Sequence, residues 1–172
     1  MVIVNFKVAM VSDYSDSTLC YFVEALEGRA AAIFVVLAGI GLGLAAKKDF
    51  EQTFSVTLRR AFFLLVIGLF NTLIFSADII HYYAFYFFIG AFMLPLSNRL
   101  LVVGIVVANL IFVLMMFTLN FDLGWDWSIN EYRNFWSPAG FLRNLFFNGW
   151  HPVFPWIGFL LFGIILSRLA LG

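Results

Sequence analysis

The feature that most constrains this chain is an apolar stretch without charged residues, 61–77, which begins directly after Arg60 and ends before Asp78. Its length is close to the roughly 20 residues that cross the hydrocarbon core of a bilayer as a helix. Arg59 and Arg60 lie at one end of the stretch, and an ionisable pair, Asp78 and His81, lies at the other. We interpret the stretch as one membrane crossing with two chemically different ends.

The composition favours a membrane protein over a water-soluble domain. Only 12% of the 172 residues are charged and 63% are hydrophobic, whereas a soluble domain carries roughly 25% charged residues. The formal net charge is zero, so nothing predicts nucleic-acid binding, which requires a clustered basic face. Cys20 is the only cysteine, which excludes an intrachain disulfide and a cysteine-based metal site. We expect no metal site.

Five apolar segments predict an all-α, polytopic membrane bundle that forms a single domain over residues 1–172. The segments are 30–46, 61–77, 79–96, 100–119 and 152–171. All are long enough to span, the first two only if the bilayer thins or flanking residues snorkel. Residues 1–10 are a shorter apolar piece, which we expect to be the outer half of a helix whose beginning is absent. The longest polar stretch is the loop 120–149.

Basic residues predict the orientation of these crossings. The cations that fall on one side are Lys47, Lys48, Arg59, Arg60, Arg99 and Arg168. Most of them lie in short loops, where Lys and Arg mark the cytoplasmic side. We therefore expect the loop 47–60 in the cytoplasm and the loop 120–149 outside.

Asp78, His81 and His151 are the candidate catalytic residues. Asp78 and His81 are three positions apart, so at the start of a helix they share one face. A carboxylate beside an imidazole can orient the ring for general-base chemistry. The alternative is that Asp78 only caps the helix and His81 is an interfacial residue. His151 precedes Pro152 at the start of the last crossing, so we expect it at the same membrane level as His81.

Lys47, Lys48, Arg59 and Arg60 are the candidate residues for binding a nucleotide-bearing donor. Their cationic side chains suit the phosphates of such a cofactor. The alternative is that they anchor the helix ends to anionic lipid headgroups. The chain has no Gly-rich phosphate loop that would strengthen the first interpretation.

The order of motifs resembles the transmembrane acyltransferase family of heparan-α-glucosaminide N-acetyltransferase and its bacterial relatives. The fragments that carry the resemblance are 1–6, 32–42, 58–62, 67–69, 78–84, 151–158 and 161–163. The resemblance implies a helical membrane domain that takes an acetyl group from cytoplasmic acetyl-CoA and delivers it to a sugar amine or hydroxyl outside. It also implies a bacterial cytoplasmic membrane as the location.

The chain departs from the family pattern in three ways. The Asp-x-x-Arg-Gly segment that precedes the first motif in the family is missing, the loop 11–19 contains no histidine, and the chain stops soon after Arg168. We therefore expect a fragment, in which His81 or His151 serves as the base. The alternative is a catalytically silent membrane subunit of a larger complex or a homo-oligomer. Transport of a small solute is a third hypothesis, weakened because the middle of the crossings has no ionisable residue.

Overall fold

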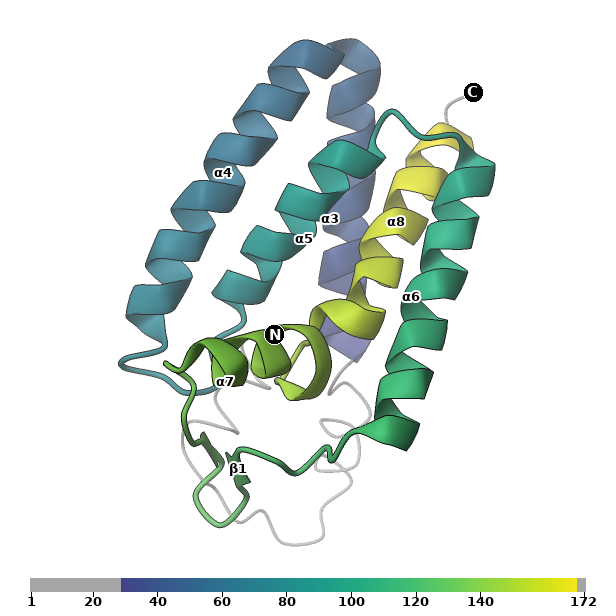
Figure 1. The fold of residues 1–172 in the computed structure, drawn as a ribbon. Helices are drawn as coiled ribbons and strands as arrows, with labels where there is room; N and C mark the ends of the chain where they lie inside the picture. The colour runs from purple at the N-terminus through teal and green to yellow at the C-terminus, as the bar shows by residue number, and fades with distance from the viewer. Residues whose placement is uncertain (1–28, 170–172) are drawn as a thin grey trace, which may run out of the picture.

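The computed structural model describes residues 29–169, which form a bundle of long helices with a smaller folded segment at one end (Figure 1). The long helices are α3 (Arg29–Lys48), α4 (Phe50–Asn71), α5 (Ile80–Met93), α6 (Asn98–Thr118) and α8 (Val153–Leu169). The described part is therefore mostly helical, as predicted. The predicted half-helix 1–10 lies outside the described residues.

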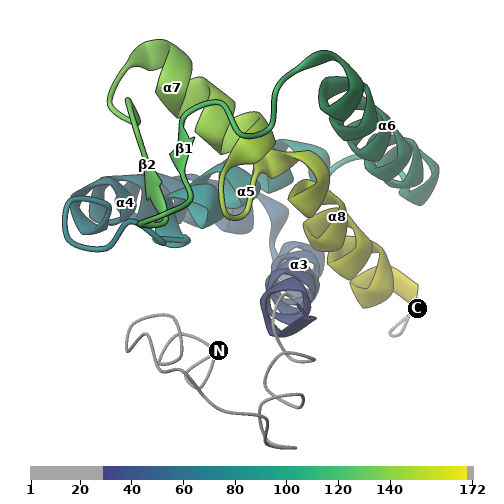
Figure 2. The same ribbon diagram turned by 90° about the horizontal axis from the view of Figure 1, so that it is seen from below.

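The bundle is held together by two helix pairs that pack closely, α3 with α8 and α4 with α5, and α6 covers another face of α8 (Figure 2). Glycines allow the close contact of α3 with α8. A Cβ atom at Gly39 would lie 2.1 Å from the backbone oxygen of Leu160, and a Cβ atom at Gly163 would lie 2.1 Å from the backbone oxygen of Val36. Larger residues would force the two backbones apart. Small residues at a membrane helix interface have this effect, because they let dispersion contacts form between backbones.

The loop predicted over 47–60 is wrong, because residues 50–60 are helical and only Asp49 separates α3 from α4. Asp49 has an extended backbone and caps α4, since its carboxylate accepts the backbone N–H of Gln52 at 3.0 Å. Its backbone oxygen also accepts the hydroxyl of Thr53 at 2.6 Å. The polar residues after Asp49 therefore continue into the crossing as the first turns of a helix.

Three described helices, α3, α4 and α6, are long and apolar enough to cross a membrane by themselves. A fourth span results if α8 is counted together with the helical segment before it, to which it is bent by 51°. The predicted crossing 79–96 is shortened to α5, whose 14 residues extend about 21 Å against a hydrocarbon core of about 30 Å. It ends at Met93, and Leu94 caps it with helical backbone angles. Pro95 follows and has no backbone N–H with which to continue the helical hydrogen bonds. Five full crossings are thus not confirmed.

The predicted loop 120–149 is folded. It holds a hairpin of β1 (Trp125–Asp126) and β2 (Glu131–Tyr132), then α7 (Pro138–Arg143), which runs into the π-helix η1 (Asn144–Asn148). Asn148 is fully buried and ties these pieces together. Its side-chain amide donates to the backbone oxygens of Phe121 and Leu123, and its side-chain oxygen accepts the Tyr132 hydroxyl at 2.9 Å.

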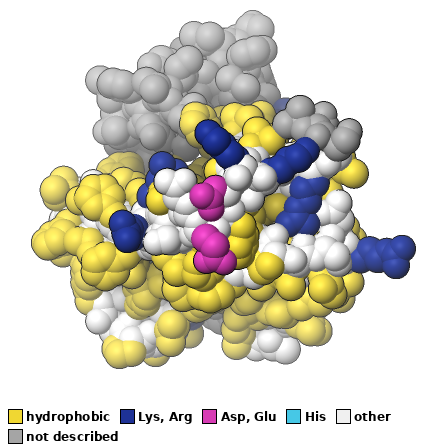
Figure 3. All heavy atoms as spheres, turned by 90° about the horizontal axis from the view of Figure 1, so that it is seen from above, with side chains coloured by type: hydrophobic (Ala, Val, Ile, Leu, Met, Phe, Trp, Pro, Cys, Tyr) yellow, Lys and Arg dark blue, Asp and Glu magenta, His cyan; other side chains and the backbone are white. Residues whose placement is uncertain are grey.

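The two ends of the bundle differ in charge. The C-termini of α3, α5 and α8 and the N-termini of α4 and α6 meet at one end, which we call the cationic end (Figure 1). Figure 3 views this end and shows Lys and Arg side chains around a smaller acidic patch. The opposite end carries β1, β2, α7 and the connection between α4 and α5, and we call it the α7 end. The predicted cations and the predicted histidines therefore lie at opposite ends.

Candidate active site

Asp78 and His81 form a buried hydrogen-bonded pair at the α7 end. Each is 2% exposed. One carboxylate oxygen of Asp78 accepts both the backbone N–H of His81, at 3.1 Å, and the Nδ1 of its ring, at 2.8 Å. The other oxygen accepts the side-chain amide of Asn71 at 2.6 Å. Asp78 therefore accepts a backbone N–H of the first turn of α5 and also orients the imidazole. Helix capping and orientation of the ring, which the sequence analysis gave as alternatives for Asp78, occur together in this arrangement.

Gly68 explains why α4 approaches α5 so closely at this point. A Cβ atom at position 68 would lie 2.4 Å from the backbone nitrogen of His81. The glycine thus lets the last turns of α4 reach the start of α5, where Asn71 can contact Asp78. Asn71 was not among the predicted site residues, and the only signal in the sequence is a polar residue near the end of an apolar stretch.

The electrostatics of Asp78 favour a carboxylate. Burial alone raises the pKa of Asp78, but the hydrogen bonds from His81 and Asn71 outweigh it and leave the pKa below its usual range. The ionised carboxylate needs a donor on His81, so a proton on Nδ1 completes the 2.8 Å hydrogen bond. Nε2 is then the ring nitrogen with a free lone pair. It is buried and has no hydrogen-bond partner among residues 29–169.

A polar cavity of about 400 Å³ lies next to this pair, between the α4–α5 connection and the folded segment of the α7 end. Its lining residues are Thr72, Ser76, His81, Tyr82, Glu131, Tyr132, Asn134, Phe135, Trp136, Ser137 and Asn144. Hydroxyl, amide and carboxylate groups mix there with aromatic rings. A cavity of this size and composition suits a small polar ligand.

His151 lies near the cavity but does not line it. Both imidazoles pack on the ring of Tyr82, with ring centroids 3.9 Å away for His81 and 6.3 Å for His151. The two imidazole centroids are therefore no more than about 10 Å apart. The His151 ring also packs edge-on against Trp156 at 4.5 Å. The structure thus brings all three predicted catalytic residues into one region.

The lowered pKa of the buried His151 ring predicts how the stability of the protein depends on pH. Burial, with a smaller contribution from the charge of His81, lowers the pKa of His151 to about 4, so the folded protein holds this ring neutral. The unfolded chain takes up a proton below about pH 6.5, and the stabilisation is lost progressively as the pH falls from 6.5 to 4. We expect His151→Gln to flatten the fall of the thermal unfolding midpoint in detergent between pH 7 and 5; an unchanged slope would contradict this assignment.

The four predicted cofactor-binding cations separate into different surroundings at the cationic end. Lys48 and Arg60 line a cavity of about 590 Å³ together with Gln52, Thr53 and Thr57. Lys47 lines another cavity of about 510 Å³ with Arg168, and Arg59 is exposed on α4. The arginine at 168 has a structural role, since its guanidinium donates to the backbone oxygens of Leu94 and Leu96.

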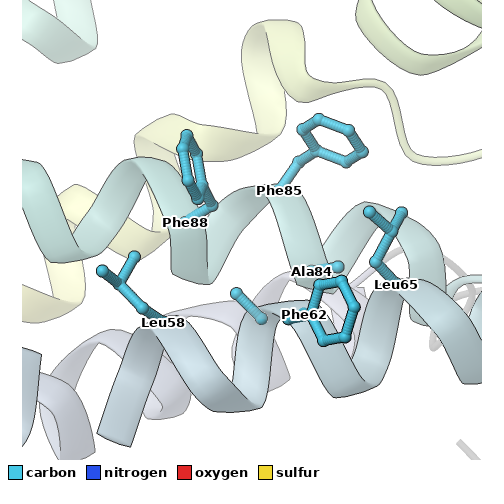
Figure 4. Close-up of a pocket in the computed structure, with 7 residues that line it drawn as sticks. Leu58, Phe62, Leu65, Ala84, Phe85 and Phe88 are labelled. Atoms are coloured by element: carbon cyan, nitrogen blue, oxygen red, sulfur yellow. The ribbon is translucent and has the colours of Figure 1, made fainter. Parts of the chain in front are cut away.

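An apolar groove of about 280 Å³ lies between the two ends, on the contact of α4 with α5 (Figure 4). Leu58, Phe62 and Leu65 of α4 face Phe85 and Phe88 of α5 across it. Ala61 and Ala84, both 3% exposed, are small enough to let the helices meet at its base.

Fold and site together define a class: an integral membrane protein of several helices, with a carboxylate-oriented histidine at one end of the bundle and a cation-lined cavity at the other. Comparison with family models assigns the chain more closely. The model described as heparan-alpha-glucosaminide N-acetyltransferase, catalytic, matches residues 1–172. The chain belongs to this family, as its motifs predicted, and membership supports a membrane acetyltransferase-like function. No curated protein and no solved structure matches the chain.

Proposed function

We propose that this protein transfers an acetyl group from acetyl-CoA, bound at the cationic end in the cytoplasm, to the amine or hydroxyl of a sugar on the outer side of a bacterial cytoplasmic membrane. The observation that carries the proposal is the free Nε2 of His81 beside the polar cavity, with Nδ1 held by Asp78. An imidazole with one nitrogen occupied and the other free is arranged as a general base.

The proposed chemistry uses the two side chains in sequence. His81 Nε2 takes the proton of the acceptor as the acceptor attacks the thioester carbonyl, and Asp78 stabilises the imidazolium that results. The same proton then passes to the sulfur of the leaving coenzyme A. Asp78 is buried and already accepts three hydrogen bonds, so it fixes the ring without needing to take the proton itself.

The cavity at the α7 end supports a sugar as the acceptor. Trp136 and Phe135 offer ring faces, and Ser137 and Glu131 offer hydrogen-bonding groups on the same wall. Sugars combine apolar ring faces with many hydroxyl groups, so this mixture is complementary to them. The carboxylate of Glu131 favours an acceptor that carries an amine.

The cavity lined by Lys48 and Arg60 supports binding of the donor. Its two cations suit phosphate groups, and Gln52, Thr53 and Thr57 add neutral hydrogen-bonding groups. Along α4 the rise from Arg60 to Asn71 is about 17 Å, a span comparable to an extended pantetheine arm. Lys48 and Arg60 would hold the nucleotide phosphates, and coenzyme A would supply the thioester to the site at the α7 end.

The proposed orientation predicts which positions a membrane-impermeant thiol reagent reaches in intact cells. In a Cys20→Ser background, we expect a cysteine at exposed Ser128, in the hairpin of the α7 end, to be labelled. We expect a cysteine at exposed Glu51, in the first turn of α4, to be labelled only after the membrane is permeabilised. The opposite pattern would show that the cationic end faces outward.

The competing proposal is a catalytically silent subunit that packs against a larger membrane assembly or a second copy of itself. Purified protein in proteoliposomes separates the two, with labelled acetyl-CoA as donor and glucosamine as acceptor. Acetylated glucosamine that depends on the protein supports the enzyme. Absence of any product that depends on the protein supports the silent subunit.

A further inference from the structure

The hydrogen bonds around Tyr82 fix the orientation of the Asn144 side-chain amide. The Tyr82 hydroxyl accepts the backbone N–H of Trp150 at 3.2 Å and contacts the Asn144 side chain at 2.5 Å. A hydroxyl has one hydrogen, and the N–H of Trp150 can only donate. The hydroxyl keeps its own hydrogen for Asn144 and donates it to the side-chain oxygen, Oδ1.

The Nδ2 amide of Asn144 is consequently the part of the side chain that remains to donate elsewhere. It makes no hydrogen bond to any residue that the structure describes. Asn144 is 3% exposed, and it lines the same polar cavity as His81. An amide donor that lines a cavity and that no protein group uses is available to a ligand in that cavity.

The local fold is built to hold this amide rigidly. Asn144 is the first residue of the π-helix η1, a type of turn that is found frequently at functional sites. Its backbone oxygen accepts the N–H of Gly149 at 2.8 Å. A Cβ atom at position 149 would lie 2.0 Å from the Tyr82 hydroxyl, so the glycine is what leaves room for that hydroxyl. The side chain and the backbone of Asn144 are both anchored.

We propose that Asn144 is a catalytic residue whose Nδ2 amide donates a hydrogen bond to the oxyanion of acetyl transfer; the inference rests on the proposed function. As the acceptor atom bonds to the thioester carbon, the carbonyl electron pair moves onto oxygen and the acceptor's proton moves to His81 Nε2. When the carbonyl re-forms, the carbon–sulfur bond breaks and the proton passes to sulfur. A preorganised donor stabilises the charge on oxygen between these two steps.

The test is Asn144→Asp, which keeps an oxygen for the Tyr82 hydroxyl but replaces the donor with a second oxygen. We expect kcat for acetyl transfer in proteoliposomes to fall by about 10²- to 10³-fold. The KM for the acceptor should change by less than about threefold, because a donor used only in the transition state does not affect ground-state binding. Asn130→Asp, an identical substitution at an exposed turn outside the cavity, is the matched control and should retain the wild-type kcat.

Each outcome decides the inference. If the Asn144→Asp variant folds and its kcat is within about threefold of the wild-type value, the role of Asn144 is overturned. If His81→Gln is inactive in the same assay, the proposed function still stands. If Asn144→Asp does not fold, judged by its thermal unfolding in detergent, Tyr82→Phe decides instead. Without the tyrosine hydroxyl the amide can rotate, so kcat should fall about tenfold, and an unchanged kcat overturns the inference. A wild type that transfers no acetyl group removes both the proposed function and this role.

Discussion

His81→Gln is expected to lower the rate of acetyl transfer by about 10²- to 10⁴-fold, the usual contribution of a positioned general base. Glutamine has a similar size and keeps a polar group, but it has no nitrogen lone pair that can take a proton near neutral pH. The buried Nε2 of His81 is the only unpartnered base that lines the polar cavity among the described residues. Initial rates with labelled acetyl-CoA and glucosamine in proteoliposomes measure the effect.

His151→Gln is the matched control for this experiment, since it makes the same substitution at the second histidine. The ring of His151 packs on Tyr82 and Trp156 and does not line the cavity. We expect its loss to change the rate by less than about tenfold, an effect of altered positioning only. Loss of transfer in His151→Gln with a fully active His81→Gln would assign the base to the other imidazole.

Asp78→Asn is expected to cost about 10²-fold or more in kcat. The asparagine can still accept the backbone N–H of His81, so the start of α5 should remain folded. The same oxygen accepts Nδ1–H of the ring, so the ring keeps its orientation, but a neutral amide lacks the negative charge that stabilises the imidazolium formed when His81 takes the proton.

The pH profile distinguishes this effect from simple misfolding. We expect Asp78→Asn to regain part of its rate at high pH, where hydroxide in solution competes as a base, while its thermal unfolding midpoint stays near that of the wild type. Asn71→Ser, which removes the amide on the other carboxylate oxygen, should lower the rate much less. A wild-type rate in Asp78→Asn would show that the carboxylate serves only as a helix cap.

The sequence predicted the parts of the fold that depend on local composition. Apolar stretches located α3, α4, α6 and α8. The pair Asp78 and His81 was found because three positions along a helix define one face. Their contact at 2.8 Å follows from this local geometry.

Some features could not be predicted from the sequence, because they depend on contacts between distant segments or on a single helix-capping residue. Tyr82 and Asn144 are 62 positions apart, and no periodicity links them. The polar residues 50–60 suggested a loop, but Asp49 caps them into a helix. Lys47 and Lys48 are adjacent in sequence yet line different cavities, because successive residues of a helix point in different directions.

The most direct test of the account is acetyl transfer across a sealed membrane. Proteoliposomes with the cationic end facing outward, selected by labelling of the Glu51→Cys reporter, receive labelled acetyl-CoA outside and contain glucosamine inside. The proposed transfer predicts acetylated glucosamine in the lumen for the wild type and almost none for His81→Gln. Labelled product that forms only when donor and acceptor share one side of the membrane, or equal transfer by wild type and His81→Gln, would contradict it.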